Sequence, residues 1–266
     1  MRLSLAHAGL AALALSVAAR AQASDIKEVH KSLALDKDGR VSIHTFKGSV
    51  TVTTWDKPTV QIDARIEPGS DDSYDREKVQ WTEVRISGSG SSVHIESDYD
   101  EVKHHTHGFF GLFDWDSGSL PLIQYTIQMP ATANLAIEDH KSDIKVSDLK
   151  ADLKLNTYKG TARVTNLDGA ARAETYKGDV RIDFARYSRA SRFETHKGEI
   201  ELRMPKDSRF DLDSDSGRHG EVETDFAILS HAGRGSRSYR ASGSVNGGGP
   251  ELRMTTYKGT LRIRAK

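Results

Sequence analysis

Along the second half of the chain, apolar and polar positions alternate in short stretches that a recurring four-residue phrase interrupts. Before the phrase, Leu155 alternates with polar neighbours, and after it Val164 and Ile182 alternate with charged residues. A period of two is typical of β-strands that are buried on one side only. The pattern therefore predicts a chain made almost entirely of short strands, joined in pairs through a corner at the repeated phrase.

The recurring phrase is Thr-aromatic-Lys-Gly, and its spacing is regular. Clear and weaker copies begin at Thr45, Asp139, Thr157, Thr175, Thr195 and Thr256. From Lys141 to Lys197 the lysines recur after 18, 18 and 20 residues, which is near the period of short solenoid repeats. The glycine offers the positive φ that other residues resist and so suits a tight corner. We expect an all-β, single-domain β-solenoid of stacked coils of about 18–20 residues.

Stacking such coils about 4.8 Å apart places like side chains over like. The rings of Tyr158, Tyr176 and His196 would then form an aromatic ladder. The lysines that follow them would form a row, and this row is a candidate binding site for an anionic polymer; its members are Lys159, Lys177 and Lys197. Glutamates three residues before a lysine would offset the repulsion, so a solvated edge is the competing interpretation; they are Glu138, Glu174 and Glu194.

Between residues 69 and 120 the phrase is absent, which indicates an insertion within one domain that spans residues 24–266. The stretches 79–87 and 92–97 alternate around a Gly-Ser turn and predict a hairpin. Five large apolar residues follow, and their spacing is not that of an element with one face in a core: Phe109, Phe110, Leu112, Phe113 and Trp115. Two interpretations stay open for them, a cap on an open end of the stack or an exposed surface that binds a partner or a membrane interface.

A short histidine tract precedes these aromatic residues and invites a metal interpretation. His104, His105 and His107 lie near several carboxylates. Adjacent side chains of an extended chain point to opposite faces, so only His105 and His107 would converge without a turn. We expect a solvated polar loop with no metal and no other cofactor, and we keep His105 and His107 as weak metal candidates.

The first 23 residues form a segment of a different kind. An apolar run follows Met1 and Arg2, and the small residues Ala21 and Ala23 flank the expected cleavage site, so we predict a secretory signal peptide, residues 1–23. The run is shorter than the ~20 apolar residues of a spanning helix, and we expect no transmembrane segment. The expected location is periplasmic, at the cell surface or secreted.

Composition excludes several classes of chemistry. The chain has no cysteine, which rules out disulfides, thiol catalysis and thiolate metal sites. It carries 38 Lys and Arg against 38 Asp and Glu, so no excess of positive charge argues for nucleic acid as a partner. Stability must come from packing and hydrogen bonds.

In its repeat and in several flanking segments, the chain resembles a bacterial family catalogued as “putative adhesin” domains, likened to the heads of autotransporter adhesins. The resemblance rests on the Tyr-Lys-Gly coils and on the segments 39–43, 47–52, 55–58, 127–130, 246–250 and 258–261. It implies a β-solenoid of the envelope or surface and supplies no catalytic residue. Likeness of shape is an analogy and does not establish function.

Together these observations favour an exported cell-envelope protein of adhesin-like type that binds or scaffolds an envelope polymer or protein partner and is not an enzyme. The alternative is a polysaccharide-active enzyme in a solenoid groove, which would need two converging carboxylates. Candidates share strand faces: Asp211, Asp213 and Asp215 on one strand, and Glu199 and Glu201 on another. The sequence indicates no base partner or pocket for them, so we assign no catalytic residue.

Overall fold

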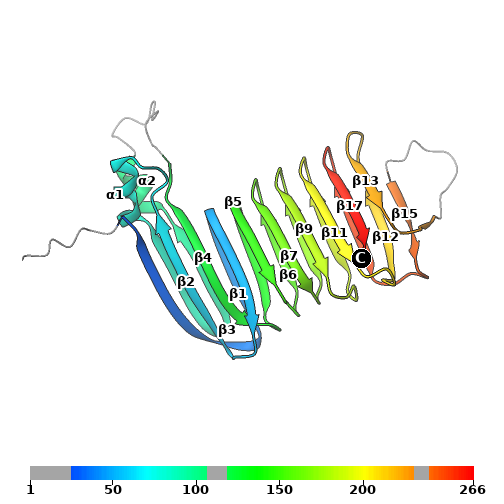
Figure 1. Ribbon diagram of the computed structural model, residues 1–266, viewed down its shortest axis with the longest axis horizontal. Coiled ribbons are helices and arrows are strands. Elements are labelled where there is room, and N and C mark those ends of the chain that lie inside the picture. Colours follow the sequence, from blue (N-terminus) through cyan, green and yellow to red (C-terminus); the bar gives the residue numbers. More distant parts are fainter. Residues whose placement is uncertain (1–24, 107–118, 231–239) are drawn as a thin grey trace, which may run out of the picture.

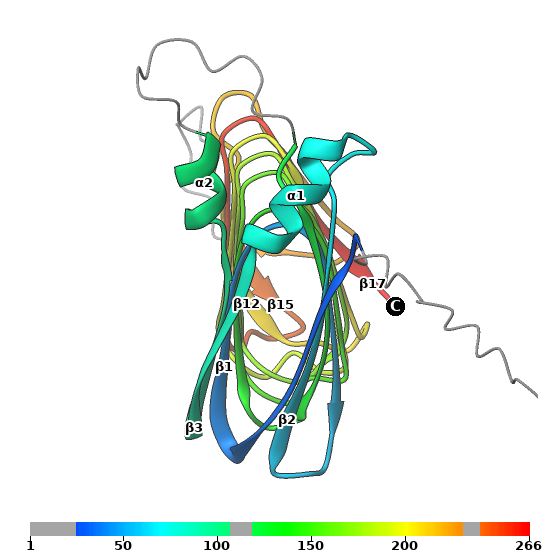
Figure 2. The same ribbon diagram turned by 90° about the vertical axis from the view of Figure 1, so that its left-hand side faces the viewer.

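The fold is a stack of two-stranded coils, seen in a computed structural model that describes residues 25–106, 119–230 and 240–266. Within these residues seventeen strands form one continuous hydrogen-bonded sheet, accompanied by two short helices. Figure 1 shows the strands side by side along the long axis. Figure 2, seen along that axis, shows two layers that meet at rounded corners. The predicted all-β architecture of stacked coils is confirmed.

Three regular coils occupy the middle of the stack, each with one strand in either layer. They are β6 (Leu153–Thr157) with β7 (Thr161–Leu167), β8 (Ala171–Thr175) with β9 (Asp179–Phe184), and β10 (Ser191–Thr195) with β11 (Glu199–Met204). Their strands pair in parallel with neighbouring coils: Thr157 lies opposite Thr175, and Thr175 lies opposite Thr195. These offsets of 18 and 20 residues are those of the sequence repeat.

Alternation along each strand builds the core between the two layers. In β9 the side chains of Val180 and Ile182 are buried, whereas Arg181 between them points outward. The inward residues of β8 and β10, among them Ala173 and Phe193, face them from the other layer. Full burial of an aliphatic or phenyl side chain contributes about 1.5–3 kcal/mol. A single coil would leave this surface in water, so stacking is what stabilises the strands.

The first and the last strands of the chain are not the outermost strands of the stack, because other strands lie beyond them at each end. At one end, β1 (Lys27–Trp55) pairs with β5 (Asn134–Ser147) on one side and with β3 (Glu83–Asp98) and β4 (Leu122–Pro130) on the other. At the other end, β16 (Glu251–Thr256) and β17 (Thr260–Ala265) lie between the β10–β11 coil and strands β12 (Phe210–Asp215) and β13 (Glu221–Thr224). Beyond β12 the sheet continues with β15 (Arg240–Val245) and β14 (Leu229–Ser230). Internal segments therefore close both ends.

The first end of the stack is covered by strand β2 (Thr59–Glu67) and helices α1 (Ser73–Trp81) and α2 (Asp100–Thr106), which face the viewer in Figure 2. The side chains of Val79 in α1 and Val102 in α2 are buried in the core. Neither helix has the length or apolar character that a bilayer crossing requires, and the described residues contain no other.

The hairpin predicted for residues 79–97 is present only from residue 83 onward. Residues 79–81, predicted as the start of its first strand, instead end helix α1, which begins because the Asp72 carboxylate accepts the Tyr74 N–H at 2.8 Å. Within β3 the chain reverses direction where Gly88 and Gly90 adopt positive φ. A Cβ on Gly88 would lie 2.2 Å from the Ser92 carbonyl oxygen, and Arg85 near the start of β3 pairs with Asp98 at its end. The second arm, residues 92–96, also pairs in parallel with residues 40–44 of β1, which joins the hairpin to the stack.

Helix α1 contains a buried ion pair, and its acidic member also binds the far end of the insertion. Lys78 Nζ lies 2.7 Å from the Asp75 carboxylate, and both side chains are almost fully buried. Asp75 also accepts hydrogen bonds from the Ser70 hydroxyl at 2.5 Å and from the Ser119 N–H at 3.2 Å. Burial by itself would raise the pKa of Asp75, but these donors outweigh it and the pKa is lowered. The two ends of the segment 70–119 are thereby held together.

Candidate functional site

Each coil turns from one layer to the other at the Thr-aromatic-Lys-Gly phrase. In the β8–β9 corner, the buried Thr175 Oγ1 accepts the Gly178 N–H at 2.8 Å. The same bond closes three other corners at 2.8–3.0 Å, from Gly160 to Thr157, Gly198 to Thr195 and Gly259 to Thr256. Because these four corners have the same internal bond, they superimpose along the stack.

The corner glycines are required by close approach between coils, which corrects the expectation that they supply positive φ. Of the glycines in the phrase, only Gly48 has φ in the left-handed region, at 134°. A Cβ on Gly178 would lie 2.1 Å from the Gly160 carbonyl oxygen, and one on Gly198 would lie 1.9 Å from that of Gly178. Any side chain here would push two coils apart.

The aromatic residues of the corners stack into one ladder, which confirms and lengthens the predicted one. Its six members are Phe46, His140, Tyr158, Tyr176, His196 and Tyr257. Neighbouring ring centroids lie 4.5–5.0 Å apart and neighbouring planes are within 18° of parallel. Each inner ring has both faces covered by its neighbours. The ladder therefore offers ring edges and hydroxyl groups to a ligand, not ring faces.

The lysines of the corners form a second row, here called the lysine row. It consists of Lys47, Lys141, Lys159, Lys177, Lys197 and Lys258. The ammonium groups of Lys159 and Lys177 lie 5.4 and 5.6 Å from the centroid of the preceding tyrosine ring, within range of a cation–π contact. Within the described part of the chain, no member forms an ion pair with a carboxylate.

The expected compensation of these lysines by glutamates is wrong. Glu138 pairs with Lys154 at 3.3 Å and Glu194 with Arg192 at 3.4 Å, both on the face of the sheet. Each glutamate lies on the strand that precedes the corner, whereas the lysine lies in the corner itself. The two side chains therefore project from different parts of the coil and do not meet. The predicted binding residues Lys159, Lys177 and Lys197 thus lie together in a row of uncompensated positive charge.

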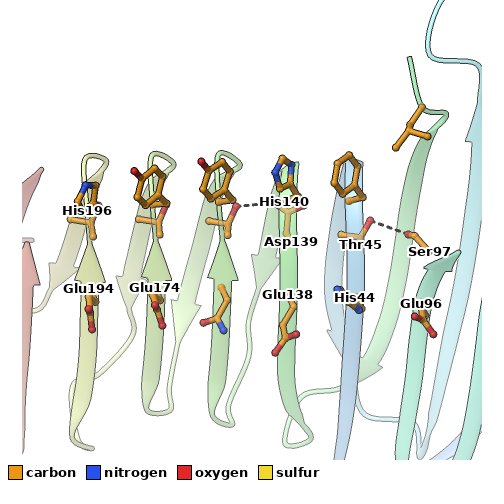
Figure 3. Close-up of a pocket in the computed structure, with 18 of the residues that line it drawn as sticks. His44, Thr45, Glu96, Ser97, Glu138, Asp139, His140, Glu174, Glu194 and His196 are labelled. Carbon is orange, nitrogen blue, oxygen red and sulfur yellow. Dashed lines mark hydrogen bonds between the residues drawn. The ribbon is translucent and has the colours of Figure 1, made fainter. Parts of the chain in front are cut away.

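The glutamates instead belong to a row that sequence reasoning missed, here called the acidic row. It contains the outward residue just before each corner, and in strand order its members are Glu96, His44, Glu138, Asn156, Glu174, Glu194, Thr255 and Asp215. Between this row and the ladder runs a groove of about 1080 Å³ (Figure 3). The signal for it was the glutamate that directly precedes the corner residue in three copies.

The repeat is broken in the middle of this groove, where Asp139 stands in place of threonine. One oxygen of Asp139 accepts the Thr157 hydroxyl at 2.7 Å and the Ser142 N–H at 3.0 Å. Its other oxygen, Oδ1, is buried and has no hydrogen-bond partner among the described residues, and the same holds for Asn156 Oδ1. Both residues line the groove.

The carboxylates proposed for the enzyme alternative are engaged in ion pairs or hydrogen bonds. Asp211, Asp213 and Asp215 share an outward face of β12, as predicted. They contact Ser244 at 2.6 Å, Arg253 at 3.1 Å and Arg240 at 3.0 Å, in that order. On β11, Glu199 pairs with Arg262.

Glu201, the remaining candidate, is only 8% exposed and lies between two arginines. Arg203 Nε is 2.6 Å and Arg181 Nε 3.2 Å from its carboxylate. Burial alone would raise the pKa of Glu201, but the hydrogen bond from Arg203 and the charge of Arg181 outweigh it and the pKa is lowered. This carboxylate ties coils together through an ionised group.

The histidine tract forms helix α2 up to residue 106 rather than the predicted loop. His104 is exposed, and the His105 ring stacks on Trp81 with centroids 4.2 Å apart. Among the described residues, no group of three or more His, Asp or Glu side chains is placed to hold a metal ion. His107 and the aromatic residues Phe109, Phe110, Leu112, Phe113 and Trp115 lie outside the described residues, so the cap and the docking surface remain predictions.

Comparison with known proteins gives one family match and several distant structural likenesses. The model of the Toastrack DUF4097 family matches residues 112–264. A “putative cell adhesion protein” from Clostridium sporogenes is 10% identical, with a TM-score of 0.49 over 90% of this chain and 100% of that one. A “putative adhesin” from Bacteroides fragilis is 13% identical, with a TM-score of 0.44 over 90% and 97%.

A “putative lipid binding protein” from Parabacteroides distasonis is 8% identical, with a TM-score of 0.40 over 89% of this chain and 96% of that one. No curated protein matches the chain. At these identities and scores, the structural likenesses do not bear on what this chain binds.

Proposed function

The chain belongs to the Toastrack DUF4097 family, and we propose that it is an exported cell-envelope protein of adhesin-like type that binds an extended anionic polymer through its lysine row. The observation that carries the proposal is the lysine row itself. Six ammonium groups follow one another at the corners of successive coils, and none has a carboxylate partner within the described residues.

Such a row is unfavourable for the protein alone. Two unit charges about 5 Å apart repel by roughly 1 kcal/mol even in water, although salt screens part of this. A chain of anionic groups that runs parallel to the stack would turn that repulsion into attraction. The ladder beside the row has five steps of 4.5–5.0 Å, so the corners that carry the lysines follow one another at nearly constant intervals.

A binding role is favoured over catalysis because the carboxylates considered for hydrolysis are held by arginines or a serine. Asp213 contacts Arg253 at 3.1 Å. Glu201 contacts Arg203 at 2.6 Å, and its lowered pKa keeps this carboxylate ionised and unavailable as a general acid. Export rests on the predicted signal peptide, residues 1–23, which precedes the described residues.

Chromatography on immobilised dextran sulfate tests the proposal. We expect the protein to be retained and to elute earlier after the triple change Lys159→Gln, Lys177→Gln and Lys197→Gln. The matched control changes three exposed lysines elsewhere, Lys37→Gln, Lys150→Gln and Lys206→Gln, and should elute close to the unchanged protein. Equal shifts for both variants would mean that only net charge matters, and the lysine row would not be a site. Fractionation of the native cells tests the envelope location.

A further inference from the structure

The groove on the other side of the aromatic ladder has the opposite charge to the lysine row. Five of the eight positions of the acidic row carry carboxylates, and none carries Lys or Arg. Among the described residues that line the groove, Lys103 is the one Lys or Arg, and it is paired with Asp100 at 3.0 Å. We infer that this groove binds an extended basic peptide segment, a function separate from that proposed for the lysine row.

The acidic row is an unfavourable arrangement for the free protein. Glu174 lies directly opposite Glu194 in the parallel register of β8 and β10, and like charges in such positions destabilise a sheet. Glu174 has no ion-pair partner within the described residues, and Glu194 has only Arg192 at 3.4 Å. Glu138 and Asp215 also have a single base at the edge of the row. Exposed pairs of this kind are worth under ~1 kcal/mol. Two residues earlier on the same face, a row of bases borders the groove on the side away from the ladder: Lys154, Arg172, Arg192 and Arg253.

A second observation, independent of the charge, also calls for a donor-rich ligand. The buried acceptors Asp139 Oδ1 and Asn156 Oδ1 lack hydrogen-bond partners and belong to residues that line the groove. Buried acceptors are normally satisfied. An ammonium group brings three donors and no acceptor, and a guanidinium brings five. Basic side chains supply what this part of the groove lacks.

The shape of the groove selects an extended chain. Eight neighbouring strands cover about 34 Å at ~4.8 Å per step, and about ten extended residues span the same length. In an extended peptide every second side chain points the same way, with a repeat of about 6.8 Å. Alternate basic residues would therefore face the acidic row along its whole length, while the other side chains meet the ring edges of the ladder. Face-on stacking of sugar rings is blocked because the ladder covers its own ring faces.

Calorimetry with two synthetic decapeptides tests the inference, one of alternating Lys and Ala and one of alternating Glu and Ala. We expect saturable binding of the first peptide only. The double change Glu174→Gln and Glu194→Gln should weaken it by about tenfold or more, in line with charge pairs at an interface. Because both side chains are on the surface and repel each other, the melting temperature should not fall, which separates loss of binding from loss of fold.

The matched control removes two exposed carboxylates outside the groove, Glu77→Gln on α1 and Glu221→Gln on β13. It should bind the peptide within about twofold of the unchanged protein. Equal weakening in the control would reduce the effect to net charge and overturn the site. Spermine that binds as tightly as the peptide would also overturn it, because a short polyamine would then suffice.

The lysine-row variant keeps this inference apart from the proposed function. Lys159→Gln, Lys177→Gln and Lys197→Gln should leave peptide binding intact or tighter, whatever happens on dextran sulfate. Loss of peptide binding in that variant would contradict a separate groove site. If the variant still binds the peptide and its elution from dextran sulfate is unchanged, the proposed function of the lysine row is contradicted and the groove site is supported.

Discussion

At the scale of single residues, neighbours on one strand have opposite roles, and Val180 shows this most directly. Its side chain is 2% exposed and faces the core of the stack. Val180→Asp would place an unpaired carboxylate there, so we expect a loss of several kcal/mol in the free energy of unfolding. Chemical denaturation measures it. As a control, Arg163→Asp on the outward face of β7, which lies between Lys145 and Arg181 in register, should change stability by less than ~1 kcal/mol.

The outward position next to Val180 is less tolerant than the alternation suggests. Arg181 holds the nearly buried Glu201, so an acid at position 181 would leave two carboxylates facing each other. Equal destabilisation by Val180→Asp and Arg163→Asp would mean that the inward register is wrong. Destabilisation by Arg181→Asp alone would not, because that change breaks a specific ion pair.

Glu201 also gives a prediction about pH. Its folded-state pKa is lowered from the ordinary value of 4.5, so its contribution to stability is complete above that value and is lost as the pH falls through the lower, folded-state pKa. Glu201→Gln should therefore cost roughly 1–2 kcal/mol at pH 7. The difference in melting temperature between the two proteins should shrink as the pH falls below 4.5. A difference that stays constant down to pH 2 would contradict an ionised, arginine-held Glu201.

At the scale of elements, the corner is the unit that the sequence describes best. The phrase with its period of 18 to 20 residues predicts the coils, their register and the aromatic ladder, because in-register stacking converts a sequence repeat directly into rows. It does not predict the role of the glycine. Backbone approach between coils depends on the distance between two chains, and a single chain segment carries no signal of it.

The corner glycine gives a test at this scale. Gly178→Ala places a methyl group 2.1 Å from the Gly160 carbonyl oxygen, so the coils must separate or the corner must distort. We expect a loss of more than about 2 kcal/mol, comparable to overpacking a core. Lys177→Ala, the adjacent and exposed position in the same corner, should be within about 0.5 kcal/mol of the unchanged protein. Equal, small effects in thermal unfolding would show that the corner can relax.

The irregular elements were harder to predict for physical reasons that differ from one element to the next. Helix α1 is a short segment whose stability comes from the Asp72 cap and the buried Asp75–Lys78 pair. Its apolar pattern alone is too short to separate helix from strand. The acidic groove exists only once eight strands from distant parts of the chain are aligned. The glutamates that form it were visible, but the row they share was not.

At the scale of the whole molecule, the order of coils in space departs from the order along the chain. The last two strands, β16 and β17, fill the place between β10–β11 and β12–β13. In a stack where each coil contacts only its neighbours, stability is roughly a sum of coil terms and interface terms. Disrupting a terminal coil removes one interface, whereas disrupting the inserted coil removes two.

The inserted coil β16–β17 should therefore be the more sensitive of the two to a core substitution. Leu261 in β17 is fully buried, and Leu261→Asp should unfold its own coil and also release β12 and β13, which have lost their neighbour. Hydrogen exchange should then show lost protection on both sides, in β11 and in β12–β13. The control is Val222→Asp in β13 at the end of the stack, in direct register with Leu261; it should lose protection in β13 with little change in β11. Protection of β12–β13 that survives Leu261→Asp would show that these strands are held by something other than the inserted coil.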